Sequence, residues 1–153
     1  MIKKEEIAKA CEKCRNAMIQ IQVAGPHEEW VGMTLPILYQ DNTIASILIF
    51  PCDGANRVTV SDGGGIARRQ RLTKEEIEAM CKRRNLEHTY IYEGNDTPCD
   101  CDIYIAVAFR DMQQAVLSIT GAIMESFRIK EESTRRQVNE RLQRARTSLR
   151  DIS

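Results

Sequence analysis

The sequence lacks the features that would place it in a membrane or in an export pathway. Its 153 residues contain no run of about 18 apolar side chains, the length that a membrane-spanning helix needs. The N-terminal segment MIKKEEIAKA is charged and has none of the apolar stretch of a signal peptide. We therefore expect the protein in the cytoplasm of the cell that makes it, with its six cysteines as thiols.

The sequence also lacks net charge and the motifs of the common enzyme classes. Lys+Arg and Asp+Glu both number 22, and this balance argues against bulk electrostatic capture of nucleic acid. There is no Walker loop, no dinucleotide-binding glycine fingerprint and no compact Asp…Glu-x-Lys arrangement of a metal-dependent nuclease. His27 and His88 have no Cys or Ser partner at a motif spacing. The sequence therefore predicts no catalytic residue and no cofactor.

Hydrophobic periodicity predicts an α+β fold, an antiparallel sheet flanked by helices with a long helix at the C-terminus. Residues 3–20 have one apolar face and are expected to form an amphipathic helix. Short strands separated by turns follow over 21–61, which is typical of an antiparallel meander. Within it, 44–50 is predicted to be a central strand, and Pro36 indicates an edge or a bulge.

The second half of the chain is predicted to be helix, two strands and helix. Thr73 and Glu76 form a capping-box pattern at a helix start, and Asn85 is a stop signal. Strands are expected over 86–93 and 101–108. The closing helix has an apolar stripe that should pack on the sheet, formed by Val116, Ile119, Ile123 and Phe127.

A change of character at residue 128 predicts two parts, a core domain over 1–127 and a basic helical extension over 128–153. Residues 128–150 contain eight basic and three acidic side chains, so their charge is 8 − 3 = +5. An apolar stripe with a four-three-four spacing runs through this stretch. The residues predicted to bind a partner are Arg135, Arg136, Val138, Arg141, Leu142, Arg144, Ala145 and Leu149.

The extension has three interpretations. Its stripe can pack against a second copy of the chain in a homodimer or lie in a groove of another protein. Its arginines can instead meet the phosphates of a nucleic acid. The third interpretation is a solvated, fraying helix, because isolated helices are marginally stable.

Four cysteines form the pattern with the ligand count of a structural zinc site: Cys11, Cys14, Cys99 and Cys101. The spacing Cys-x-x-Cys suits half of such a site, whereas Cys-x-Cys is unusual. Helical periodicity explains the first pair, and strand alternation the second, as small core residues. Core packing is therefore the preferred interpretation, and zinc is the alternative.

A glycine-rich segment, Ser61-Asp62-Gly63-Gly64-Gly65-Ile66-Ala67-Arg68-Arg69, follows the strand at 57–61. Backbone amides at such a turn can bind phosphate, with Arg68 and Arg69 nearby. The simpler interpretation is a tight turn beside Asp62 whose glycines allow positive φ. A metal- or phosphate-dependent enzyme around Asp62 and Arg68 is the minority alternative for function.

Three segments carry a resemblance to a known family: Val60-Ser61-Asp62-Gly63, Arg84-Asn85-Leu86 and Met112-Gln113-Gln114-Ala115-Val116-Leu117-Ser118-Ile119. Through them the chain resembles, over roughly residues 3–125, a family of small domains of unknown function found in phages, prophages and bacteria. In that family a short meander ends in a Thr-Asp-Asp-Gly turn, whereas this sequence has a Ser in place of the Thr and lacks one Asp; the extension from 128 also departs from the family. If a phage encodes the chain, we expect it in the cytoplasm of the host cell.

The resemblance implies a mobile-element origin and supplies no catalytic residues. Together with the unmatched stripe, it leads us to expect a non-enzymatic module that binds a host protein or complex, for instance an anti-CRISPR-like inhibitor of a defence system. The alternative is a nucleic-acid-associated protein that uses the basic C-terminal helix.

Overall fold

The fold is α+β, as the sequence predicts. The computed structural model describes residues 1–17, 22–26, 30–52, 56–92 and 100–152, and of residues 13–17, 22–26 and 92 it describes the backbone alone. The helices are α1 (Lys4–Ala17), α2 (Gly65–Gln70), α3 (Lys74–Arg84) and α4 (Met112–Ile152), with a 3-10 turn η1 (Phe109–Asp111) before α4. The strands are β1 (Gln22–Pro26), β2 (Val31–Leu38), β3 (Ile44–Pro51), β4 (Arg57–Ser61), β5 (Glu87–Tyr92) and β6 (Asp100–Ala108).

Within these described ranges the strands form one six-stranded sheet in the order β1-β2-β3-β4-β6-β5. Every neighbouring pair is antiparallel, so the meander predicted for the first four strands is confirmed. The pairing of β2 with β3 shifts register between Thr34 and Leu38, and Pro36 lies in this irregularity because it has no N–H for the ladder. β6 lies between β4 and β5, so the hairpin β5–β6 joins the meander through its second strand.

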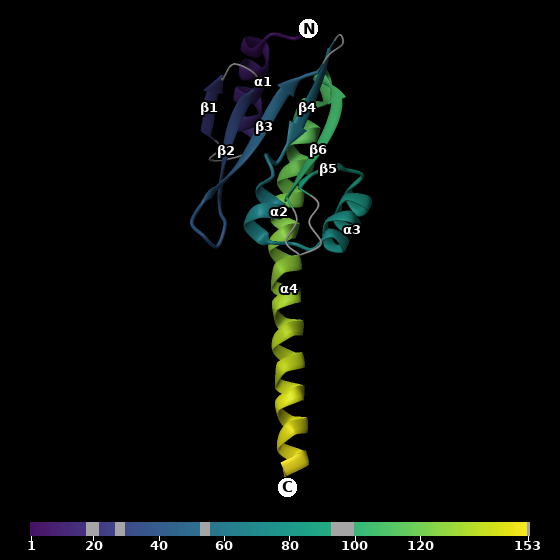
Figure 1. Ribbon diagram of the computed structural model, residues 1–153. Coiled ribbons are helices and arrows are strands. Elements are labelled where there is room, and N and C mark those ends of the chain that lie inside the picture. The colour runs from purple at the N-terminus through teal and green to yellow at the C-terminus, as the bar shows by residue number, and fades with distance from the viewer. Residues whose placement is uncertain (18–21, 27–29, 53–55, 93–99, 153) are drawn as a thin grey trace.

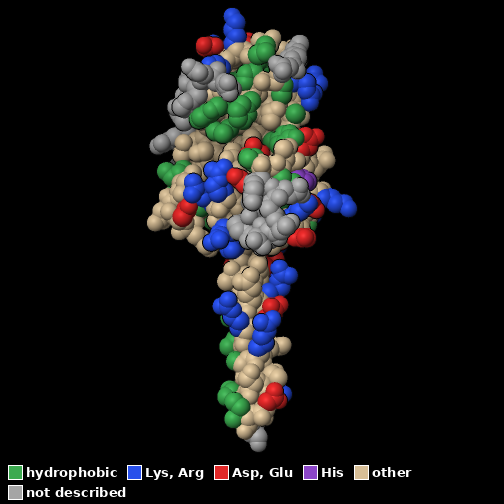
Figure 2. Space-filling view, in the orientation of Figure 1, with side chains coloured by type: hydrophobic (Ala, Val, Ile, Leu, Met, Phe, Trp, Pro, Cys, Tyr) green, Lys and Arg blue, Asp and Glu red, His purple; other side chains and the backbone are tan. Residues whose placement is uncertain are grey.

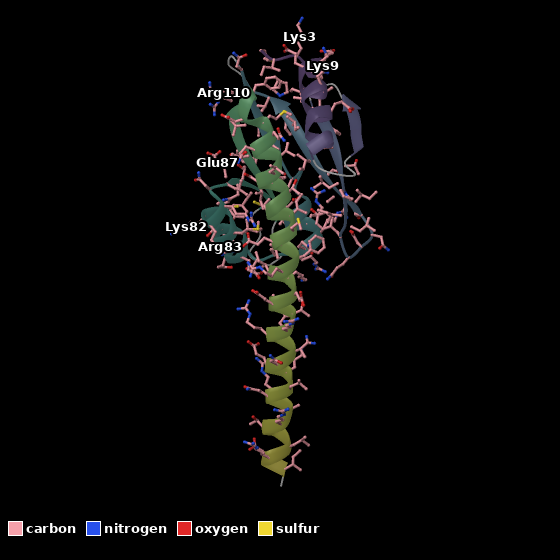
Figure 3. All side chains as sticks on the ribbon, turned by 180° about the vertical axis from the view of Figure 1, so that it is seen from behind. Lys3, Lys9, Lys82, Arg83, Glu87 and Arg110 are labelled. Atoms are coloured by element: carbon pink, nitrogen blue, oxygen red, sulfur yellow. The ribbon has the colours of Figure 1, made fainter. Side chains whose placement is uncertain are left out.

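The molecule has two layers, with α1 and α4 on one face of the sheet (Figures 1 and 3). Alternation along β3 sends Ile47 and Ile49 into the core, where they are fully buried, and leaves Leu48 and Phe50 half-buried on the opposite face. The stripe predicted for the closing helix is confirmed as core packing, because Val116, Ile119 and Ile123 are fully buried and Phe127 packs at the edge.

α4 is one continuous helix of 41 residues, of which only the first part belongs to the domain. Ile129 is its last buried side chain and Ser133 its last half-buried one. The rest projects away from the domain and ends at the C-terminus (Figure 1). The boundary predicted after residue 127 thus falls inside one helix. Among the described helices, none combines the length and apolar character that crossing a bilayer requires.

Two local signals in the sequence are confirmed at α3. The Thr73 hydroxyl accepts a hydrogen bond from the Glu76 N–H, and the Glu76 carboxylate accepts one from the Thr73 N–H. Asn85 ends the helix in the left-handed conformation, with φ 55°. α2 was not predicted, because residues 61–69 were expected to form a turn.

Candidate functional site

The glycine-rich segment is organised around the Asp62 carboxylate, which is 4% exposed. Its Oδ1 accepts hydrogen bonds from the N–H groups of Gly64 and Ile103, each at 3.0 Å, and its Oδ2 accepts one from Ile66 at 2.9 Å. One side chain therefore fixes the turn after β4, the start of α2 and the neighbouring strand β6. Burial raises the pKa of Asp62 to about 6, although these three hydrogen bonds lower it.

The amides that were candidates for phosphate binding already have acceptors inside the turn. The Gly63 N–H donates to the Ser61 hydroxyl, and the Gly65 N–H donates to the Asp62 carbonyl. Gly63 and Gly64 have φ values of 63° and 77°, so the prediction of positive φ is confirmed for these two glycines, whereas Gly65 is the first residue of α2. A phosphate at this turn would have to displace the Asp62 carboxylate from the N–H groups of Gly64 and Ile66.

A small cavity of about 160 Å³ adjoins the turn, between β3, α2 and the end of β2. Tyr39 lines it, and its hydroxyl has no hydrogen-bond partner among the described residues. Burial raises the pKa of Tyr39, and the negative charge of Asp62 adds to this shift, so the phenol stays protonated. Arg68 and Arg69, which the sequence predicted near the turn, line the same cavity.

Both arginines at the cavity are paired with carboxylates. Arg69 Nη1 lies 2.9 Å from Asp41 Oδ2, and Arg68 Nη2 lies 3.6 Å from Asp100 Oδ1. Burial and the neighbouring negative charge of Asp100 raise the pKa of Asp102. Within the described residues, no cluster of three or more His, Cys, Asp or Glu side chains has the arrangement of a metal site.

The predicted zinc ligands are placed only in part. Cys11 in α1 and Cys101 in β6 are both fully buried, as core packing requires. The side chain of Cys14 and the whole of Cys99 lie outside the described residues, as does His27. Burial, and then the nearby charges of Asp62 and Glu78, raise the pKa of Cys81 to about 11, so that thiol is a packing residue rather than a nucleophile.

The projecting segment, residues 134–152 of α4, contains the predicted partner-binding side chains. Val138, Leu142 and Leu149 are 48%, 51% and 69% exposed, and Ala145 is exposed between them. Ile152, 82% exposed, continues the spacing by three residues and was missed by the sequence interpretation because it lies at the helix end. These five residues form the apolar stripe. Figure 2 shows hydrophobic side chains along one side of the projecting segment, with basic side chains beside them.

The arginines of the projecting segment differ in whether they have a carboxylate partner. Near the domain, Arg135 is paired with Glu131 at 2.6 Å. Further out, four arginines have no carboxylate partner among the described residues, and all are exposed. They are Arg136, Arg141, Arg144 and Arg146.

A cluster of charged residues holds α4 to α3 just before the helix leaves the domain. The Glu125 carboxylate, 8% exposed, accepts hydrogen bonds from Arg83 at 2.9 Å, from Arg84 and from Arg128 at 3.1 Å. Figure 3 shows Arg83 at the end of α3 beside α4. Tyr39 stacks on Phe127 with ring centroids 5.6 Å apart. The direction in which the segment projects is therefore fixed by contacts on two sides.

Comparison with known proteins supports the fold and gives no evidence on function. No protein-family model matches the chain, and no curated protein matches it. An uncharacterized protein from Methanothermobacter thermautotrophicus has a similar crystal structure, with a TM-score of 0.51 and 9% sequence identity over 82% of this chain and 96% of that chain. At such an identity the likeness extends to the α+β architecture alone and brings no residue roles.

Proposed function

We propose that the protein is a non-enzymatic interaction module whose binding element is the projecting segment of α4. The apolar stripe carries this proposal, because its large aliphatic side chains are about half or more exposed to water and no other described residue covers them. Burying them against a partner would recover about 25 cal/mol for each Å² of apolar surface removed from water. Amphipathic helices bind protein grooves and other helices through stripes of this spacing.

A rigid scaffold supports this proposal. The Glu125 cluster and the stack of Tyr39 on Phe127 hold α4 where it leaves the domain. The segment is therefore presented as a preformed helix, and a partner would not have to supply the whole cost of ordering it. The expectation of a host defence complex as the target comes from the family resemblance and stays a prediction.

A second candidate is a nucleic acid, favoured by the four exposed arginines without carboxylate partners. They are spread around the helix instead of lining one face, since Arg141 and Arg146 flank the stripe while Arg136 and Arg144 lie behind it. Phosphate contacts would make binding fall steeply as salt rises. Protein contacts through the apolar stripe would be far less sensitive to salt.

The test uses two double variants on the same turns of the helix. Leu142→Asp with Leu149→Asp places charges in the stripe. Gln143→Asp with Thr147→Asp places the same charges on the opposite face and is the matched control. Pull-downs from a bacterial lysate, treated with nuclease and repeated at low and high salt, compare both variants with the unsubstituted chain.

We expect the unsubstituted chain and the control to recover the same proteins, the chain itself included, and the stripe variant to lose them. Equal recovery of proteins by the unsubstituted chain, the control and the stripe variant would contradict the proposal. Recovery that disappears after nuclease treatment and at high salt would favour the second candidate instead.

A further inference from the structure

The apolar stripe has the pattern of one strand of a short coiled coil. Val138, Leu142, Ala145, Leu149 and Ile152 recur at intervals of four, three, four and three, which is the heptad spacing. They occupy alternate core positions, with Leu142 and Leu149 at a and the other three at d. Two helices carrying this pattern can interdigitate over about two heptads.

Charge decides between the two orientations of such a pair. In a parallel pair, the g position of one helix lies beside the following e position of its partner, so Arg141 would face Arg146 of the partner subunit twice. Arg135, at the preceding a position, would also face its own copy. Like charges in these places oppose pairing.

The antiparallel orientation removes these conflicts. With Leu142 opposite Ala145 of the partner subunit and Val138 opposite Leu149 of the partner subunit, four successive layers are apolar, each joining a larger side chain to a smaller one. Here g positions face g positions and e positions face e positions. Arg141 then lies beside Ser148 of the partner subunit, and Arg146 beside Asn139 of the partner subunit.

The length of the projecting segment fits this register. Ile152 of one helix comes to lie opposite Arg135 of the other, two residues beyond Ser133, which is the last residue that the domain partly covers. The tip of each helix thus ends where the exposed part of its partner begins. The two domains then lie at opposite ends of the paired helices.

We propose that the occupant of the apolar stripe is a second copy of this chain, bound antiparallel in this register. The inference rests on the proposed function, because it names the partner of the same surface. It predicts a dimer with a central two-helix rod, a domain at each end, Arg141 and Arg146 along the edges of the helix interface, and Arg136 and Arg144 facing outward.

The first test is sedimentation equilibrium of the purified full chain over a wide concentration range. We expect a mass approaching twice the 17.5 kDa of one chain. The dimer should persist in the Gln143→Asp/Thr147→Asp control and be lost in Leu142→Asp/Leu149→Asp. A dimer that survives the stripe substitutions would overturn the inference, since it would use another surface.

Disulfide formation tests the orientation. Val138→Cys mixed with Leu149→Cys should give a crosslinked dimer only when both variants are present. In this register two copies of residue 138 are separated by 11 residues of helix, roughly 16 Å of rise, too far for a disulfide. Crosslinking of Val138→Cys with itself would show a parallel pair and contradict the proposal. The unsubstituted chain controls for the native cysteines.

A charge substitution tests the register independently. Ser148→Glu would place a carboxylate beside Arg141 of the partner subunit at two symmetric points, and we expect the dimer dissociation constant to fall about threefold or more. Thr147→Glu adds the same charge one residue away, facing outward, and should leave it within about twofold. Equal effects of the two substitutions would rule out this register.

The two proposals fail in different ways. A chain that stays monomeric at every concentration ends the dimer inference but leaves the proposed function intact if the stripe variant still loses other proteins in the pull-down. A monomer whose stripe variant behaves like the unsubstituted chain in both experiments ends both.

Discussion

Asp62 is a buried carboxylate whose partners are all backbone N–H groups. Two of them, on Gly64 and Ile66, are local, and the third belongs to Ile103 in β6, 41 residues further on. The sequence identifies Asp62 as a turn residue, because Asp before glycines is typical of turns. Its bond to β6 was beyond prediction, since it depends on β6 pairing with β4 rather than on any local pattern.

Asp62 makes stability depend on pH in an unusual direction. Because its pKa rises from 3.8 to about 6 on folding, the folded state binds this proton more tightly than the unfolded state does. The contribution is fully present below pH 3.8 and is lost as pH rises through 6. The free energy of unfolding, relative to an Asp62→Asn variant, should therefore fall by about 3 kcal/mol in total, of which about 2 kcal/mol is lost between pH 4 and pH 6, and become level above about pH 7.

Urea unfolding at several pH values measures this difference. Asp111→Asn, at an exposed position next to the start of α4, controls for the loss of one carboxylate. A difference between the unsubstituted chain and Asp62→Asn that is constant from pH 4 to pH 7 would show that the Asp62 carboxylate is not destabilised by burial.

At the scale of single elements, the start of α3 depends on the capping box at Thr73. Thr73→Ala removes the acceptor for the Glu76 N–H and should lower the free energy of unfolding by about 1 kcal/mol. Thr147→Ala, where the hydroxyl only returns to the Gln143 carbonyl in the exposed helix, should change it by less than about 0.5 kcal/mol. Equal losses in the two variants would mean that the cap contributes nothing.

The attachment of α4 to α3 depends on Glu125. Burial raises its pKa, but the hydrogen bonds from Arg84 and Arg83 outweigh burial, and the net shift is downward from 4.5. Glu125→Gln should cost about 1 to 2 kcal/mol at pH 7, because three partly exposed guanidinium groups lose their shared counter-charge.

The sign of this shift gives a second check. Stabilisation by a carboxylate with a lowered pKa is present above its ordinary value and is lost as pH falls through the folded-state value. The gap between Glu125→Gln and the unsubstituted chain should therefore begin to narrow as pH falls below 4.5 and close once pH is below the lowered folded-state pKa. Glu132→Gln, at an exposed ion pair, is the control; a gap that widens in acid would refute the assignment.

Element types were largely predictable, and their arrangement was not. Alternation and the capping signals located the strands and α3, because these patterns are local. α2 was missed because it has only six residues and begins at the last of three successive glycines, and six residues are too few for helical periodicity to be recognised. The place of β6 between β4 and β5 was also not predictable, since either strand of a hairpin can pair with the meander.

At the scale of the whole molecule, a truncation pair locates the end of the domain. A chain ending at Ser133 should have a free energy of unfolding within about 0.5 kcal/mol of that of the full chain, when both are measured at concentrations where they are monomers. A chain ending at Phe127 should lose about 2 kcal/mol, because it lacks the buried Ile129 and the Arg128 bond to Glu125. Calorimetry or urea titration measures both, and equal stability of the two truncated chains would place the boundary at residue 127.

At the candidate site, the residues were predictable from the sequence, but their exposure was not. The stripe and the arginines were predicted because helical spacing alone defines them. That nothing in the described chain covers them is a property of the tertiary structure, because Val116 and Leu142 lie in equally regular patterns but only Val116 meets the sheet.

Because α4 is continuous, a small tilt of the helix inside the domain becomes a larger displacement at its C-terminal end. The same helix that lies against the sheet extends, without a Pro, to a tip roughly 30 Å beyond Ser133, at 1.5 Å of rise per residue. A tilt of about 5° within the domain would move that tip by roughly 3 Å. Small adjustments of the side chains around Glu125 would thus be amplified at the tip, and force applied there would act on the core through the same arm.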